Sequence, residues 1–169
     1  DIKTTYSGIG NSTDLNITTG AAALTMGDIA ATAANTLDAV TVSGAGVLVT
    51  EAIAANSVAI TSGDFSSSTI AANSLTANVE DFVATDLTIE GAVAITASKT
   101  VTVDGIDNTA ANTATLTINA GDDVTFTDGI GQDNVATDLG AVSITSTAGS
   151  ISIEQLDSDA DVTLSAAGA

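Results

Sequence analysis

Ala52–Thr61 (AIAANSVAIT) and Thr69–Asn78 (TIAANSLTAN) repeat one pattern 17 positions apart. In both stretches Ala-Ala-Asn is followed by Ser and then by an aliphatic residue, and Ala-Ala-Asn occurs again at residues 33–35 and 110–112. The four asparagines are 21, 17 and 39 residues apart, a mean of about 19 if the last interval is two steps. Self-similarity near 20 residues predicts a solenoid, in which each coil stacks on the one before it.

A second pattern, alternation of apolar and small polar residues, runs along the rest of the chain. Such alternation predicts short β-strands with one buried and one hydrated face, and Gly-containing turns separate them. The Ala-rich segments 28–39 and 68–84 carry a looser helical pattern, but both contain the repeat, so we interpret them as coil corners. The alternating pairs are Leu15/Ile17, Val40/Val42, Val47/Val49, Val58/Ile60, Leu87/Ile89, Val93/Ile95, Val101/Val103, Leu116/Ile118, Val124/Phe126, Val142/Ile144, Ile151/Ile153 and Val162/Leu164.

Together the two patterns predict an all-β chain, most simply a parallel β-solenoid (β-helix) of about 19-residue coils. Eight to nine coils would follow, each rising about 4.8 Å, and stacked asparagines would form ladders. The alternative is an antiparallel β-sandwich, in which segments such as Val40–Val49 and Leu116–Phe126 are hairpins. The chain has only three Phe, one Tyr and no Trp, which favours narrow coils filled with aliphatic residues over a sandwich core.

Composition restricts the classes of function. Two Lys or Arg stand against 21 Asp or Glu in 169 residues, a formal net charge of −19. Two cations cannot neutralise a run of phosphates, so we expect no nucleic-acid partner. No apolar run reaches the roughly 18 residues of a membrane-spanning helix, so we expect no membrane insertion. The chain lacks His and Cys, and with them the common nucleophile arrangements and thiolate zinc sites. We therefore expect no enzymatic activity and no required cofactor.

We expect one domain over residues 1–169, with the repeat body at 21–169. The less patterned residues 1–20, which include Tyr6, predict an N-terminal extension or a strand that pairs with a neighbouring subunit. The chain begins at Asp1 without a signal-peptide pattern, from which we expect a processed, exported protein outside the cell or on its surface. Strong acidity suits surroundings rich in salt and divalent cations, which screen self-repulsion.

Carboxylates are the remaining candidates for binding chemistry, and Ca²⁺ is the cation that they suit. Asp157, Asp159 and Asp161 alternate, so on an extended chain they would project to one side. The spacing resembles the start of an EF-hand loop, but Val162 and Gly168 occupy the positions that need Gly and Glu. The competing interpretation is a set of hydrated carboxylates that bind nothing.

A second candidate Ca²⁺ set consists of Asp122, Asp123 and Asp128, which flank the predicted strand at 124–126. Asp104 and Asp107 lie around an expected turn at Gly105. The competing interpretation is that turn aspartates hydrogen-bond their own backbone.

Two Asn-x-Thr patterns, at residues 11–13 and 16–18, fit the N-glycosylation acceptor.

Three segments of the C-terminal half resemble a known class of protein. Asn119–Gly131, Gly140–Ile153 and Asp161–Gly168 are similar to stretches of large filamentous-haemagglutinin-like adhesins, mainly within residues 85–169. The overall composition resembles the β-solenoid portions of bacterial surface-layer proteins. The resemblance implies an exported right-handed β-helix that acts in adhesion and matrix formation. The chain departs from calcium-binding nonapeptide repeats, since it has no Gly-Gly-x-Gly-x-Asp pattern.

Our leading functional expectation is a structural, non-enzymatic extracellular protein that associates with copies of itself through strand pairing, as a filament, pilus-like fibre or surface lattice. The alternative is a segment of a surface adhesin that binds glycans or host and abiotic surfaces. A third hypothesis, a polysaccharide-active β-helix enzyme, would need two carboxylates at a glycosidase separation.

Overall fold

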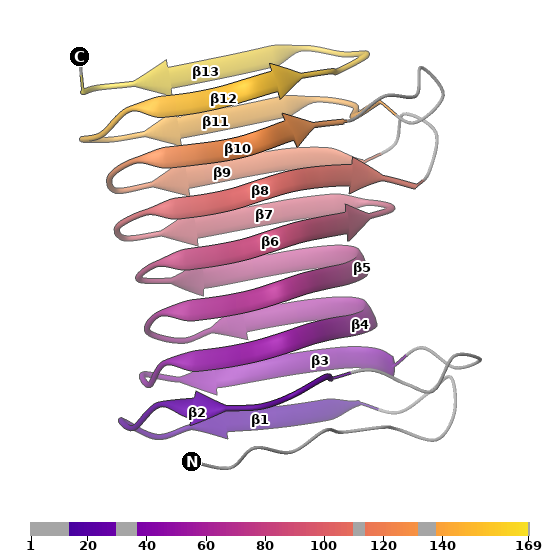
Figure 1. Cartoon of the computed structure of the whole chain (residues 1–169), viewed down its shortest axis with the longest axis vertical. Helices are drawn as coiled ribbons and strands as arrows, with labels where there is room; N and C mark the ends of the chain where they lie inside the picture. The colour runs from indigo at the N-terminus through magenta and orange to yellow at the C-terminus, as the bar shows by residue number, and fades with distance from the viewer. Residues whose placement is uncertain (1–13, 30–36, 110–113, 132–137, 169) are drawn as a thin grey trace.

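The chain folds into a parallel β-solenoid whose coils are spaced roughly 19 residues apart (Figure 1). This computed structural model describes residues 14–29, 37–109, 114–131 and 138–168. Thirteen strands and no helix occur in these ranges, so the described part contains no helix that could cross a membrane. The predicted all-β solenoid is confirmed.

The strands form two rows that run side by side along the long axis, and each coil contributes to both. The first row contains β1 (Leu15–Thr19), β3 (Leu37–Gly44), β7 (Ala92–Ala97), β9 (Thr115–Ala120), β11 (Val142–Ser146) and β13 (Val162–Ala166). The second row contains β2 (Leu24–Thr25), β6 (Phe82–Ile89), β8 (Val101–Asn108), β10 (Val124–Ile130) and β12 (Ile151–Leu156). The long strands β4 (Leu48–Thr61) and β5 (Phe65–Val79) pass through both rows.

The sandwich alternative is wrong, because the paired strands are parallel throughout the described ranges. Val40–Val49 is no hairpin: after its Gly-containing turn the chain crosses to the other row. Coil length also varies, since Leu48 pairs with Phe65, 17 positions later, whereas Leu116 pairs with Val142, 26 positions later. Within the described ranges the first row stacks eight strand segments, in line with the eight to nine coils expected.

The Ala-Ala-Asn repeat forms the corner between the two rows. Residues 54–55 of β4 pair in register with residues 71–72 of β5, and both strands continue past the asparagine into the first row. Segment 68–84 is therefore strand throughout most of its length, with a corner inside β5. The side-chain amide of Asn56 donates to the carboxylate of Asp38, in the preceding coil, at 3.3 Å. In the expected asparagine ladder this partner would have been another asparagine. The repeats at 33–35 and 110–112 lie outside the described residues.

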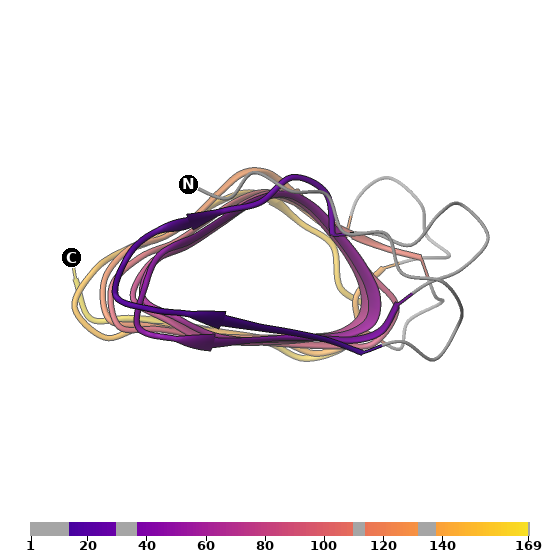
Figure 2. The ribbon, with the colours of Figure 1, turned by 90° about the horizontal axis from the view of Figure 1, so that it is seen from below.

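Inward-facing residues of both rows fill the solenoid. Pairs such as Val93/Ile95 and Leu116/Ile118 are almost completely buried, as alternation requires. The three phenylalanines are buried too, and the rings of Phe65 and Phe82 contact at a centroid distance of 5.3 Å. Viewed along the axis, successive coils superimpose, and the first row is straight whereas the second row bows outward (Figure 2).

Candidate functional site

A ladder of polar contacts joins successive coils at the turn that leads into the second row. Asp81 immediately precedes β6, and its carboxylate accepts hydrogen bonds from the backbone N–H and the hydroxyl of Thr100, one coil later, at 3.0 and 2.6 Å. Asp123 precedes β10 and accepts the same two bonds from Ser150, at 2.7 and 2.9 Å. A carboxylate in one coil thus fixes the start of the next coil's strand.

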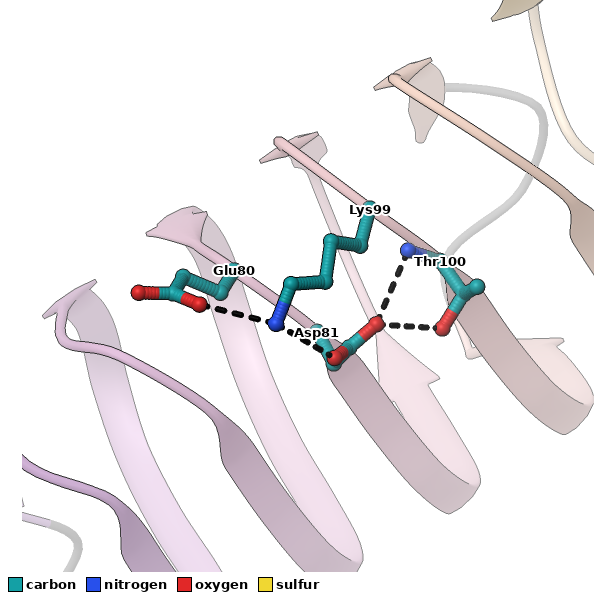
Figure 3. Close-up of polar contacts among 4 residues, drawn as sticks. All are labelled: Glu80, Asp81, Lys99 and Thr100. Carbon is teal, nitrogen blue, oxygen red and sulfur yellow. Dashed lines mark hydrogen bonds and ion pairs between the residues drawn. The ribbon is translucent and has the colours of Figure 1, made fainter. Parts of the chain in front are cut away.

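Lys99 joins this ladder to two acidic residues (Figure 3). Its ammonium nitrogen lies 2.9 Å from Glu80 and 3.6 Å from Asp81. The hydrogen bond to Glu80 and the charge of Glu80 raise the pKa of Lys99. The hydroxyl of Thr100, then its N–H, lower the pKa of Asp81. Both shifts favour the charged forms, so the group stabilises neighbouring coils as an ion-pair network.

The structure separates the second candidate Ca²⁺ set. Asp122 and Asp123 lie in the turn before β10, whereas Asp128 lies near the end of β10, about 16 Å away along an extended strand. The backbone N–H of Ser150, then its hydroxyl, lower the pKa of Asp123, so this carboxylate already has partners. The competing interpretation, in which turn aspartates bond their own backbone, does not describe Asp123 either, because its carboxylate accepts from the next coil.

The expected turn around Gly105 is wrong as well. Residues 104, 105 and 107 lie within β8, where Gly105 pairs with Asp86 and Asp107 pairs with Thr88. The carboxylate of Asp104 accepts a 2.6 Å hydrogen bond from the hydroxyl of Thr127, on the neighbouring strand β10. Pairing with Asp86 of β6 holds the glycine within the strand.

The first candidate set lies around the last crossing of the chain between the two rows. Burial, then the charges of Asp159 and Asp157, raise the pKa of Asp138, a residue absent from our prediction. Asp157 accepts a 2.7 Å hydrogen bond from the amide of Gln155, and Asp161 is exposed. No group of three metal-ligating side chains suited to an ion occurs among the described residues. Calcium binding by either set stays a prediction.

The most distinctive surface is the C-terminal coil, built from β12 and β13. These two strands end the sheet order, each paired along only one edge within the described ranges. Their inward-facing side chains are uncovered: Val162 is 43% exposed and Leu164 is 50% exposed, whereas Val142 and Ile144, one coil earlier, are buried. An open apolar hollow of about 340 Å³ is lined by Ile151, Ile153, Leu164 and Ala166. We call these six side chains of β12 and β13 (Ile151, Ile153, Leu156, Val162, Leu164 and Ala166) the open end.

Sequence reasoning placed the alternating pairs at 151/153 and 162/164 correctly but did not distinguish them from the buried pairs. The missing information was the coil register, which shows that no described strand follows them. The ion pair between Lys99 and Glu80 was also missed, because the two residues are 19 positions apart in the sequence. The glycosylation pattern at 16–18 lies on β1, with Asn16 and Thr18 exposed, whereas that at 11–13 and Tyr6 lie outside the described residues.

Comparison with known proteins gives no relative: no family model, curated protein or solved structure matches the chain. The resemblance to filamentous-haemagglutinin-like and surface-layer proteins stays a prediction.

Proposed function

We propose that this protein is a structural, non-enzymatic component outside the cell that associates end to end with copies of itself into a filament or lattice. The observation that carries the proposal is the open end, where the continuous apolar columns of the stack are uncovered. Val162 and Leu164 are half exposed there, in columns whose members are buried from β3 to β11. Both edge strands also present backbone donors and acceptors that a further strand could pair with.

The partner that fits this end is the first coil of a second copy. Leu15 and Ile17 of β1 occupy, through consecutive register partners, the same two columns that end in Val162 and Leu164. Placing β1 of one copy against β13 of another continues both columns and keeps the strands parallel. This contact joins different surfaces of the two copies, so it produces an open filament.

Charge sets the conditions for this association. Copies that carry −19 each repel one another, and the carboxylates near the open end, among them Glu154 and Asp161, add to the repulsion. Salt at 0.1 M shortens the range of that repulsion to about 10 Å. We expect filaments to lengthen with salt, because strand pairing and aliphatic burial act at contact and are screened little.

The test is sedimentation velocity and negative-stain imaging of the 169-residue chain over a range of concentrations and salt, with and without EDTA. Leu164→Asp places a charge in the open end, whereas Thr163→Asp places the same charge on the outer face of the same strand. We expect rods for the unchanged chain and for Thr163→Asp, and single particles for Leu164→Asp. Single particles for the unchanged chain in every condition contradict the proposal, as does an equal effect of the two variants.

The alternative, a segment of a surface adhesin, is supported by a different observation. The first row forms a straight face (Figure 2); its strands β1, β7, β9, β11 and β13 contain no charged residue, and β3 contains one, Asp38. A nearly uncharged face on a chain of net charge −19 is the surface through which such a segment would adhere.

A further inference from the structure

The outer face of the first row is a two-column array of small polar side chains. Each strand contributes two outward residues, two positions apart, and register pairs them coil by coil from β1 to β13. The first column is Asn16, Thr41, Ala59, Thr76, Ala94, Thr117, Ser143 and Thr163. The second column is Thr18, Ser43, Thr61, Asn78, Thr96, Asn119, Thr145 and Ser165. We call these sixteen residues the hydroxyl face. Eleven are Thr or Ser, none is charged, and none is buried.

The hydroxyl face repeats in two dimensions. Parallel strands set the coils about 4.8 Å apart, and residues two apart on a strand are separated by about 6.6 Å. The first row is nearly straight in projection (Figure 2), so the array is flat across its width. Because the strands are hydrogen-bonded on both sides between β3 and β11, the array is held rigid before any partner arrives.

The opposite face differs in chemistry. Outward positions of the second row carry carboxylates along the length of the solenoid: Glu51, Asp86, Asp104, Asp107, Asp128 and Glu154. The second row also bows outward (Figure 2). Outward carboxylates within strands therefore lie mainly in the second row, where they hold water, whereas the sixteen residues of the hydroxyl face are neutral. Other carboxylates lie in the turns, and Asp38 lies near the start of β3.

We propose that the hydroxyl face binds the surface of crystalline ice. This inference rests on the adhesive candidate above and not on end-to-end association. Ice presents an uncharged, flat lattice of water oxygens whose repeats are of the same order as the two spacings of this face. Threonine offers a hydroxyl that bonds to water and a methyl group that fits between water molecules, so a rigid array of such groups orders water in its own repeat. A carboxylate would instead hold its own hydration shell, and the face contains none.

Two other occupants fit less well. A second copy pressed face to face would bury roughly 500 Å² per partner, taken from seven steps of about 4.8 Å and a width of about 14 Å, below the roughly 800 Å² per partner of a stable interface. A crystalline polysaccharide presents sugar rings that aromatic side chains stack on. All three phenylalanines are buried in the core, and no other aromatic residue belongs to the described ranges.

The test is ice-affinity partition and inhibition of ice recrystallisation by the 169-residue chain. Thr96→Tyr places a ring at the centre of the hydroxyl face, and Val83→Tyr places the same ring on exposed β6 of the opposite row. Tyrosine suits strands, so both variants should fold, which circular dichroism checks. We expect the unchanged chain and Val83→Tyr to concentrate in the ice fraction and Thr96→Tyr to lose that enrichment.

Exclusion of the unchanged chain from ice overturns the inference, as does equal enrichment of the two folded tyrosine variants. Binding to powdered crystalline polysaccharide without enrichment in ice would contradict the proposal and identify a polysaccharide as the ligand. Dimerisation that is lost in Thr96→Tyr alone would identify a second copy of the chain as the partner. Leu164→Asp, which leaves the hydroxyl face unchanged, separates the two proposals. Single particles of Leu164→Asp should still enter the ice fraction if the inference holds, whether or not the unchanged chain forms filaments.

Discussion

The substitution Thr100→Val tests the ladder that joins the coils. It removes the hydroxyl that donates to Asp81 at 2.6 Å, while it keeps the β-branched shape and the backbone N–H that donates at 3.0 Å. Thr100 lies in the turn before β8, so the change removes one contact between consecutive coils and leaves the buried core intact.

The magnitude follows from the surroundings of the carboxylate. A hydrogen bond to a charged group contributes about 1.5–3 kcal/mol, and leaving a charged acceptor short of a partner costs most when water cannot replace the donor. The side chain of Asp81 is 28% exposed and keeps both the N–H of Thr100 and the nearby Lys99. Water and these remaining donors compensate in part, so we expect Thr100→Val to lower the free energy of unfolding by about 1 kcal/mol.

The effect should depend on pH with a defined sign. The contacts lower the pKa of Asp81 below the value of 3.8 for an unperturbed aspartate, so its contribution to stability is present above pH 3.8. It is lost as the pH falls through the lower pKa of the folded state, where the carboxylate takes up a proton. The difference between Thr100→Val and the unchanged chain should therefore shrink in acid.

Urea unfolding followed by circular dichroism, at neutral pH and at several values below pH 3.8, measures both quantities. Thr102→Val on β8 is the matched control, since its hydroxyl makes no hydrogen bond within the described part of the chain. A Thr100→Val chain as stable as the control at neutral pH would refute the reasoning, and so would a difference that persists undiminished in acid.

Three further changes probe the core, the turns and the ion pairs. Phe82→Ala should lower the free energy of unfolding by about 3–5 kcal/mol, measured by urea unfolding, because the ring is fully buried against the core. Gly121→Ala should destabilise the chain in a thermal melt, since a Cβ there collides with a backbone carbonyl of the preceding coil, whereas Gly20→Ala meets open space and should not. Lys99→Gln should lower the melting temperature at low salt and have little effect at high salt, because it leaves neighbouring carboxylates unneutralised.

Local sequence patterns predicted strands well because alternation and burial share one cause. In Val93/Ile95 and Leu116/Ile118, each large aliphatic residue faces the interior and each small residue between them faces water. The choice between parallel and antiparallel pairing came from the longer repeat, since a hairpin and a coil turn use the same Gly-containing residues. The repeat was most informative where coils are shortest, at 54–56 and 71–73, which pair across 17 positions.

The side-chain contacts between coils could not be predicted, because they depend on the length of each coil. Asp81 contacts Thr100, 19 positions later, while Asp123 contacts Ser150, 27 positions later. An error of one residue in register would turn each side chain to the other face. The same dependence made Gly105 look like a turn residue, although pairing to Asp86 keeps it within a strand.

The two proposed surfaces lie at right angles and reinforce each other. The open end faces along the axis, and the hydroxyl face runs beside it, so a copy added at the end continues the same two columns in the same register. A filament would then present one long lattice-matched face in place of a short one of about 34 Å. Because weak contacts to a crystal add when they are held in one rigid body, the affinity of the face for ice should rise steeply with filament length. The sixteen residues of the hydroxyl face carry no charge, so a chain of net charge −19 still offers a neutral surface to ice, whereas carboxylates such as Glu154 and Asp161 lie near the open end.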